Sequence, residues 1–245
     1  MRSRRALKAT DVTQHVLQKF PVRLPRFDEQ FFLPAWAELL AAVPFNYGRN
    51  SEIFGDHEPV QYLYKVVEGG VRTFKILRDG RRQIVGFYLS GDFFGFEMEN
   101  EHTLSAEAVT QSKVLVIKRD VLAVLAKHNS DVARQLLNLT GDELKHVQTH
   151  VTLLMQTASE RVAGFLLEMA SRTGRTDLQL MMSRQDIADY LGLTIETVSR
   201  VLSDLEDAAA IRRPTSRRVV LCNRAMLVRL HGEAVETRPQ GTQLA

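Results

Sequence analysis

Two short amphipathic helices joined by a tight glycine turn are predicted over residues 183–202. Ser183 is a favourable N-cap, and Asp186 three residues later approximates a capping box. Gly192 supplies the turn, and Thr194 can cap the second helix. The second helix then has the i, i+3, i+4, i+7 spacing of a buried apolar stripe, at Val198, Val201, Leu202 and Leu205. This pattern is typical of a helix-turn-helix that reads DNA.

The face of the second helix opposite this stripe carries side chains that can read base edges. In helix-turn-helix motifs the N-terminal half of the second helix enters the major groove, where the base pairs can be distinguished. The candidate DNA-contacting residues of the motif are Arg184, Thr194, Ile195, Glu196, Thr197, Ser199 and Arg200. Because any amphipathic helix pair joined by glycine would show the same apolar spacing, a helix pair with a purely structural role is the alternative.

A basic segment directly after the second helix favours DNA binding over that alternative. Four arginines and no acid fall between Ile211 and Val219. Residues 211–221 have the pattern of a strand, a turn and a second strand, which would form a wing beside the DNA backbone. Within the wing, Arg217 and Arg218 are candidate phosphate contacts.

The composition excludes several other classes of protein. With 44% hydrophobic and 25% charged residues among 245, the chain has the composition of a globular protein of one large or two smaller domains. No apolar run approaches the roughly 18 residues of a membrane span, and the Arg-rich start is not followed by an apolar signal core. We therefore expect a cytoplasmic protein without a membrane partner. The net charge of +3 favours a polyanionic partner only weakly, since the location of the charge matters more than its size.

No metal site, cofactor or catalytic centre is expected. The lone Cys222 excludes an internal disulfide and a cysteine-rich zinc or iron–sulfur site. It is interpreted as a small packed side chain, with a redox switch as the alternative. His146 and His150 stand four residues apart, but no third ligand is spaced to complete a metal site. The sequence also lacks a nucleophile and base at meaningful spacing, a phosphate loop and a carboxylate pair, so no enzyme activity is predicted.

The N-terminal half divides into a basic extension and a β-rich domain. Residues 1–30 carry seven Lys or Arg against three acids, and two prolines, which indicates a flexible or loosely docked extension. Residues 31–129 begin with an expected amphipathic helix over 31–40 and continue as short apolar runs cut by turn residues. These runs predict a small antiparallel barrel or roll, with Asp79-Gly80 closing a hairpin. The expected strands span residues 62–67, 71–77, 82–89, 104–109 and 114–117.

A long helix is predicted to join this domain to the DNA-reading one. Over residues 130–156 apolar side chains repeat in heptads, and the polar residues around them indicate a helix that pairs with a second copy of the chain. Packing of this helix on its own barrel is the alternative. Residues 157–231 form the predicted winged helix-turn-helix domain, which begins with a helix over 160–171 capped by Thr157 or Ser159, and residues 232–245 form a polar tail. The proposed dimer seam consists of Leu137, Leu144, Val147, Val151 and Leu154.

In this order the parts resemble the Crp/Fnr superfamily of bacterial transcription regulators, and within it the Fnr and FixK-like branch. Residues 86–97 resemble the family's sensory-domain signature, and Glu196-Thr-Val-Ser-Arg200 matches the Glu-x-x-Ser-Arg of Fnr-type recognition helices. The resemblance covers roughly residues 35–231. It implies an α+β chain with a cyclic-nucleotide-binding-like antiparallel β-roll, a long dimerisation helix and a C-terminal winged helix-turn-helix. It also implies that Glu196, Ser199 and Arg200 read a TTG-type half-site, similar to TTGAT followed by an inverted copy.

Departures from the family pattern indicate a member without the family's known sensor groups. Members that bind cyclic AMP hold its phosphate with an Arg-Ser pair and its ribose with a Glu, whereas the corresponding residues here look like Leu104-Ser105 and Phe96. A nucleotide anion would lose its charge partner, so cyclic AMP dependence is not expected. The chain also lacks the cysteine cluster of oxygen-sensing Fnr proteins.

The sequence therefore predicts a homodimeric transcription activator that binds a palindromic promoter site in double-stranded DNA and contacts RNA polymerase. The centres of its half-sites would lie one helical turn, about 34 Å, apart. The resemblance to the FixK-like branch implies control of microaerobic, anaerobic or nitrogen-fixation genes. The alternative is a regulator of the same family that a small ligand, such as a cyclic nucleotide, shifts between weak and strong DNA binding.

Overall fold

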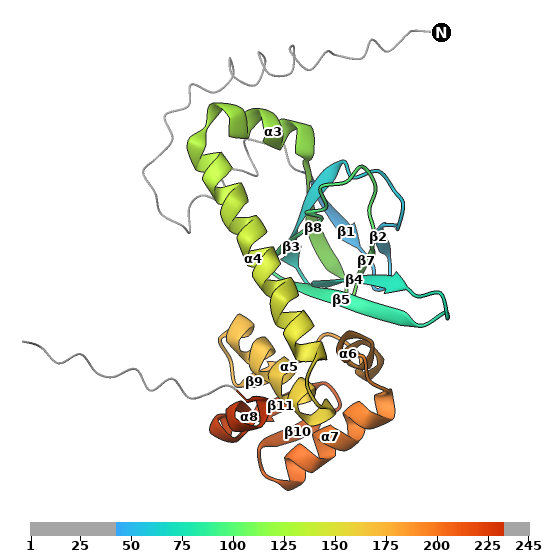
Figure 1. The fold of residues 1–245 in the computed structure, drawn as a ribbon, viewed down its shortest axis with the longest axis vertical. Coiled ribbons are helices and arrows are strands. Elements are labelled where there is room, and N and C mark those ends of the chain that lie inside the picture. Colours follow the sequence, from blue (N-terminus) through green and yellow to red (C-terminus); the bar gives the residue numbers. More distant parts are fainter. Residues whose placement is uncertain (1–42, 233–245) are drawn as a thin grey trace, which may run out of the picture.

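Residues 43–232 are described by the computed structural model, and they form a β-roll, a long helix and a C-terminal helical domain (Figure 1). The predicted basic extension, the helix expected over residues 31–40 and the tail after Gly232 lie outside this part of the chain. Within residues 43–232 no helix has both the length and the apolar character needed to cross a membrane.

The roll consists of two four-stranded antiparallel sheets. The order in one sheet is β1 (Val43–Tyr47), β8 (Ser112–Lys118), β3 (Tyr62–Glu68) and β6 (Phe93–Phe94). The order in the other is β2 (Glu52–Phe54), β7 (Ser105–Ala108), β4 (Gly70–Ile76) and β5 (Arg82–Leu89). The five expected strands are present as β3, β4, β5, β7 and β8, and the pairing of β4 with β5 confirms the predicted hairpin. Strands β2 and β6 have only three and two residues, too few to show a period.

Aromatic side chains from both sheets fill the interior of the roll. The centre of the Tyr64 ring lies 5.2 Å from the centre of the Phe54 ring and 5.1 Å from that of the Phe94 ring. His102 stacks on Phe54 with ring centres 3.7 Å apart, and Tyr88 covers Phe94 at 5.2 Å. All five rings are buried, so the centre of the roll is packed with protein side chains.

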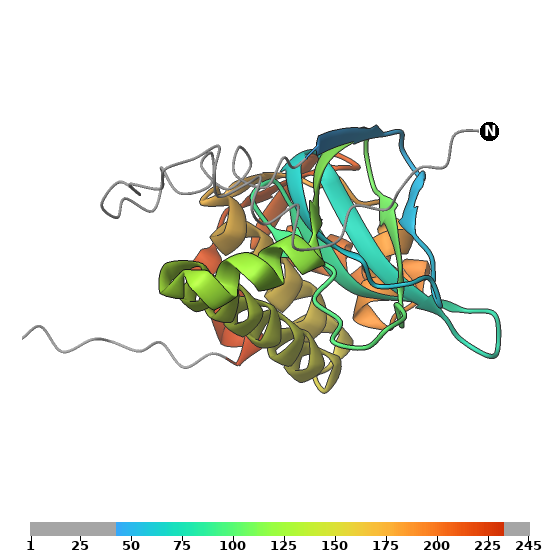
Figure 2. The same ribbon diagram turned by 90° about the horizontal axis from the view of Figure 1, so that it is seen from above.

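Two helices, α3 (Arg119–His128) and α4 (Ser130–Leu154), follow the roll, and α4 runs beside it toward the C-terminal domain (Figures 1 and 2). Asn129 separates them, because its side chain accepts hydrogen bonds from the backbone N–H groups of Asp131 and Val132 and so caps α4. With 25 residues α4 is about 37 Å long, which lets it contact both the roll and the C-terminal domain.

The C-terminal domain begins with α5 (Ala158–Thr173). Thr157 and Glu160 form a complete capping box at its start, and Gly174 ends it in a left-handed conformation with φ of 65°. The domain continues with β9 (Asp177–Gln179), α6 (Arg184–Leu191), α7 (Ile195–Asp207), β10 (Ile211–Thr215), β11 (Arg218–Leu221) and α8 (Arg224–His231). Strands β10, β11 and β9 form one three-stranded sheet, so the predicted wing gains a third strand that the sequence pattern had not indicated.

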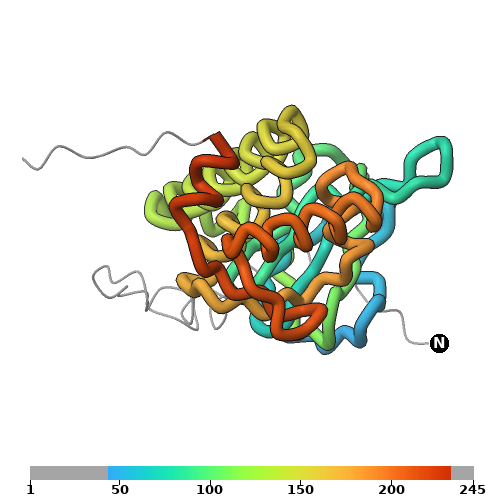
Figure 3. The backbone as a smooth tube through the Cα atoms, turned by 90° about the horizontal axis from the view of Figure 1, so that it is seen from below, coloured from blue at the N-terminus to red at the C-terminus, as the bar shows by residue number. Residues whose placement is uncertain are grey.

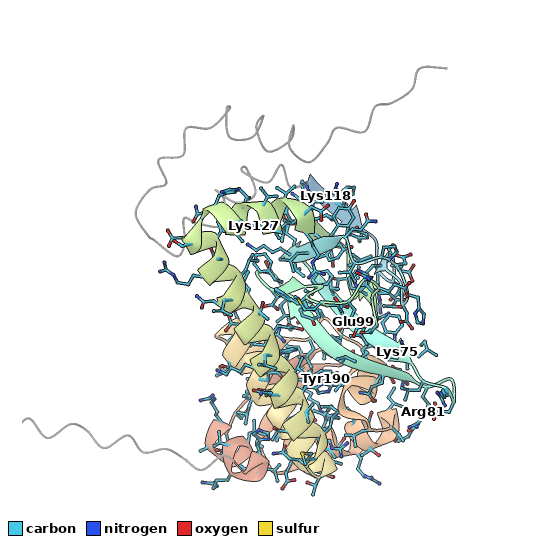
Figure 4. The ribbon with its side chains drawn as sticks, turned by 45° about the horizontal axis from the view of Figure 1, so that its top comes forward. Lys75, Arg81, Glu99, Lys118, Lys127 and Tyr190 are labelled. Atoms are coloured by element: carbon cyan, nitrogen blue, oxygen red, sulfur yellow. The ribbon has the colours of Figure 1, made fainter. Side chains whose placement is uncertain are left out.

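One hydrophobic core joins the roll to the C-terminal domain. Ile84 and Phe87 of β5 belong to the same buried cluster as Phe165 of α5 and Tyr190 of α6. The ring centres of Phe87 and Tyr190 are 5.0 Å apart, and His150 of α4 stacks on Tyr190 at 3.9 Å (Tyr190 is labelled in Figure 4). Because burial of apolar surface is the main favourable term in folding, this cluster holds the roll against the domain that carries α6 and α7.

Candidate nucleic-acid interface

Local hydrogen bonds fix the two helices of the predicted motif. The Ser183 hydroxyl accepts from the Asp186 N–H at 3.1 Å, and the Ser183 N–H donates to the Asp186 carboxylate at 3.0 Å, which completes the capping box of α6. Helix α6 ends at Gly192, whose φ of 62° lies in the left-handed region. Thr194 caps α7 by accepting from the Thr197 N–H at 3.2 Å. These contacts confirm the helices, the caps and the turn predicted from the sequence.

Helix α7 buries its predicted stripe and exposes the opposite face. The buried residues are Val198, Val201, Leu202 and Leu205. Ile195, Glu196, Ser199 and Arg200 are exposed, and neither the Glu196 carboxylate nor the Arg200 guanidinium forms an ion pair within residues 43–232. Thr194 and Thr197 lie at the start of the helix with their hydroxyls 3.1 Å apart. Figure 1 places α7 at the end of the molecule away from α3, and Figure 3 views this end from below.

Arg184 lies half-buried at the N-terminus of α6 without an acidic partner among the described residues. Burial lowers the pKa of its guanidinium, and the nearby Arg213 lowers it further. Arg213 itself is paired with Glu206, with 2.6 Å between nitrogen and oxygen. A phosphate beside Arg184 would supply the missing negative charge, and the positive end of the helix dipole favours an anion at the same place.

The wing contains paired and unpaired arginines. Arg218 makes two hydrogen bonds of 2.9 and 2.6 Å to the carboxylate of Asp177 on β9. Arg217 lies in the turn between β10 and β11 and has no carboxylate partner in the described part of the chain. Because a bidentate ion pair already satisfies Arg218, Arg217 is the better candidate for a phosphate contact. The sequence pattern could not separate them, since Asp177 lies 41 positions before Arg218.

A stripe of exposed apolar side chains runs along α4. Leu137, Leu144 and Val151 are 71%, 58% and 53% exposed, and Val147 lies on the same face with 37%. These are four of the five residues of the predicted seam. A long helix that leaves them in water has an apolar face without a partner among residues 43–232.

Leu154, the fifth predicted seam residue, does not follow this pattern. It is half-buried, and its Cδ2 lies 3.6 Å from the position that a Cβ on Gly192 would occupy, so it packs against the turn within the same chain. Met155, with 82% of its surface exposed, takes the next place beyond Val151. A strict seven-residue repeat placed Leu154 on the seam. An α-helix has 3.6 rather than 3.5 residues per turn, so residues seven apart shift gradually around the helix, and Leu154 turns away from the exposed face.

The positions that resemble the family's nucleotide-binding residues offer no free charge in this roll. The Ser105 hydroxyl accepts a hydrogen bond from the Asp56 backbone N–H at 3.0 Å, and Leu104 and Phe96 carry no charge. The arginine buried in the roll, Arg72, is bound to the carboxylates of Glu107 at 2.6 Å and Asp186 at 3.1 Å. A cyclic nucleotide phosphate would therefore meet no free cation at these positions.

The two histidines of α4 have separate partners. His150 Nε2 lies 2.8 Å from the carbonyl oxygen of Tyr190, and His146 Nδ1 lies 3.6 Å from the Glu168 carboxylate. Burial lowers the pKa of His146 to about 4, so this imidazole is neutral at physiological pH. Across residues 43–232 no group of three or more His, Cys, Asp or Glu is arranged to hold a metal ion.

Cys222 is exposed, so its interpretation as a packed side chain was wrong. Strand alternation buries Val219 and Leu221, so the residue that follows them, Cys222, points to the opposite face, toward solvent.

Comparison with known proteins identifies relatives of the whole architecture. Residues 44–129 match the cyclic nucleotide-binding domain model, and residues 160–230 match the Crp-like helix-turn-helix domain model. The chain is 47% identical over 203 residues to the nitrogen fixation regulation protein FixK of Azorhizobium caulinodans, covering 79% of this chain and 82% of that protein. It is 40% identical to FixK of Rhizobium meliloti, covering 71% and 80%. The solved structure of FixK2 from Bradyrhizobium japonicum matches with a TM-score of 0.75 and 46% identity, covering 79% of this chain and 99% of that one.

The left-handed turn at Gly192 leads to a stability prediction. A Cβ there would meet its nearest heavy atom, on Arg161, at 3.4 Å, so the cost of a side chain comes from the backbone conformation. We expect Gly192→Ala to lower the free energy of unfolding by about 1–2 kcal/mol. Gly141→Ala on α4, where a Cβ meets open space, is the matched control and should raise it by about 0.5–1 kcal/mol. Chemical denaturation at one protein concentration measures both, and changes of the same sign would contradict this account.

Proposed function

The chain belongs to the Crp/Fnr superfamily of DNA-binding transcription regulators, in its FixK-like branch, and we propose that it acts as a homodimer on TTGAT-like inverted repeats in promoters. The observation that supports this proposal most directly is the exposed face of α7. It presents Glu196, Ser199 and Arg200, the three residues that match the Glu-x-x-Ser-Arg of Fnr-type recognition helices, at the end of the molecule away from α3.

Glu196, Ser199 and Arg200 suit base reading, because their side chains form no hydrogen bond or ion pair with other residues among 43–232. The Arg200 guanidinium can donate two hydrogen bonds to guanine O6 and N7, and the Glu196 carboxylate can accept from a cytosine amino group. Ile195 offers an apolar contact for a thymine methyl. Arg184 and Arg217 would meet phosphates on either side of the groove, while Thr194 and Thr197 hold the start of the helix and Arg218 is held by Asp177.

The apolar stripe of α4 supports the homodimer. Two copies that pair along Leu137, Leu144, Val147 and Val151 would cover these side chains and give the assembly twofold symmetry. A twofold dimer presents two copies of α7, one to each half-site, with half-site centres about 34 Å apart.

The named relatives suggest which genes are controlled. Two of them are nitrogen fixation regulation proteins, so we propose that this regulator activates nitrogen-fixation or other microaerobic and anaerobic genes by contacting RNA polymerase at the promoter. It would act in the cytoplasm, where bacterial promoters are.

The assignment of base reading to Arg200 and phosphate binding to Arg217 is directly testable. Arg200→Ala should remove the preference for the TTG half-site, a loss of about 1–3 kcal/mol of discrimination, while non-specific binding remains. Arg217→Ala should weaken binding to all sequences alike and make the dependence on salt shallower. Both variants are titrated on consensus and scrambled duplexes at several salt concentrations.

Arg218→Ala is the matched control for Arg217→Ala, because its guanidinium is already paired with Asp177. It should change the salt dependence less than Arg217→Ala does. If Arg200→Ala keeps the wild-type ratio of consensus to scrambled affinity, α7 does not read the site through this residue.

The dimer is tested by charging its seam. Leu144→Glu combined with Val151→Glu would place four carboxylates without partners between the two helices and should separate the protomers. Light scattering at micromolar concentration gives the mass. Met98→Glu, at an apolar residue that is 90% exposed on the roll, is the control and should keep the wild-type mass. A double variant that also keeps this mass would show that the stripe is not the dimer seam.

The alternative function is a regulator whose DNA binding depends on a cyclic nucleotide. The aromatic side chains that fill the interior of the roll argue against this alternative. We expect calorimetry to detect no binding of cyclic AMP at micromolar concentration, because Leu104 and Phe96 cannot replace the charged residues that hold it. The affinity for the consensus duplex should be equal with and without the nucleotide, and 5′-AMP controls for non-specific effects. Micromolar binding, or a large gain in DNA affinity, would favour the ligand-gated regulator instead.

A further inference from the structure

A cluster of charged side chains is buried where the β4–β5 hairpin meets α6. Arg72 of β4 and Arg82 of β5 both reach the carboxylate of Asp186, at 3.1 and 2.6 Å. Arg82 also contacts Asp189 one turn further along α6, at 2.7 Å. The side chains of Arg72 and Asp186 are each only 6% exposed, so the cluster lies inside the junction.

Asp186 has two roles, one for each of its oxygens. Oδ2 accepts from the Ser183 backbone N–H at 3.0 Å and hydroxyl at 2.8 Å and so completes the cap of α6. Oδ1 accepts from both Arg72 and Arg82. The residue that starts the first helix of the motif is therefore the same residue through which the roll holds that helix.

These ionic contacts differ in kind from the apolar contacts around them. The contacts of Ile84 and Phe87 with the C-terminal domain hold the two parts together, but hydrophobic burial has no direction. Hydrogen bonds from guanidinium groups to carboxylates require a defined distance and angle, so they select one tilt of α6 among those that the apolar surface would tolerate. A buried ion pair often adds little to the free energy of unfolding, because removing both charges from water is costly. Its best-supported role is to select one relative arrangement of the elements that it joins.

The orientation of α6 determines that of α7. The two helices are joined at Gly192 and share one buried cluster with the roll, so a tilt of α6 moves the recognition face relative to the roll and to α4. In a dimer held along α4, such a tilt would change the distance and the angle between the two copies of α7.

We propose that Arg72 and Arg82 are positioning residues for DNA recognition, which act through Asp186 and Asp189 to set the spacing and orientation of half-sites that the dimer accepts. This inference rests on the proposed function, namely that a dimer reads an inverted repeat. Base preference within a half-site belongs to α7 itself and does not require these arginines.

The test measures spacing preference separately from base preference. One series of duplexes carries the inverted repeat with its half-sites one helical turn apart, or with one or two base pairs inserted or removed. Each inserted base pair moves a half-site by about 3.4 Å and rotates it by about 34°. A second series keeps the spacing and scrambles one half-site. Binding is measured for the full-length wild type and for two variants that leave the more deeply buried Arg72 and Asp186 in place. Arg82→Gln removes the charge that pairs with Asp186 and Asp189, and Asp189→Asn removes only the Arg82–Asp189 ion pair.

Both variants should lose spacing preference by about fivefold or more, a coupling of ordinary size between two parts of a protein, and keep the ratio of consensus to scrambled half-sites. Arg82→Lys, which retains the charge, should restore part of the preference. Arg81→Gln is the matched control: Arg81 is the preceding residue, lies near the outer end of the hairpin (Figure 4) and pairs with Asp79 within the hairpin, so this variant should behave as wild type.

Two results would overturn the proposal, and they differ in meaning. If Arg82→Gln and Asp189→Asn weaken binding to every duplex equally, with a lower melting temperature and an unchanged spacing preference, the cluster is only structural. If the wild type itself has no spacing preference, the inverted-repeat function fails and this inference fails with it.

Discussion

Burial of one face of β5 against α5 and α6 is the interaction on which the rest of the structure depends. Ile84 and Phe87 on the roll and Phe165 and Tyr190 on the C-terminal domain are buried together, and neither surface could be left in water without a large loss of stability. Once these surfaces meet, α4 is fixed between them, because His150 stacks on Tyr190 and hydrogen-bonds its carbonyl group. This arrangement leaves one face of α4 and one face of α7 exposed, where a second copy of the chain and DNA could bind.

Local sequence patterns predicted much of this structure because their causes are local. The caps at Ser183 and Thr157 and the β4–β5 hairpin depend on residues a few positions apart, and all were found as expected. Strand β9 was missed because its three residues pair only with a strand 41 positions later. The contacts of Asp186 with Arg72 and Arg82 span 114 and 104 positions, and no spacing rule connects residues that far apart.

Charge in the candidate interface depends on pairing more than on the number of arginines. The basic segment of the wing appeared uniform in the sequence, but Arg213 and Arg218 are neutralised by Glu206 and Asp177. Arg184, Arg200 and Arg217 have no such partner within the described residues. A net charge of only +3 is therefore compatible with DNA binding, because these three unpaired arginines lie together around α6, α7 and the wing.

The shared core also limits how this protein can be recombined with its relatives. The sequence suggests a natural cut after α4, between a sensory module and a DNA-binding module that could be exchanged. A cut there would leave Tyr190 without Phe87 and His150, and Asp186 without both of its arginines. A working chimaera would have to carry the inner face of the β4–β5 hairpin together with α6. The segments that must be exchanged together therefore lie on both sides of the boundary after α4.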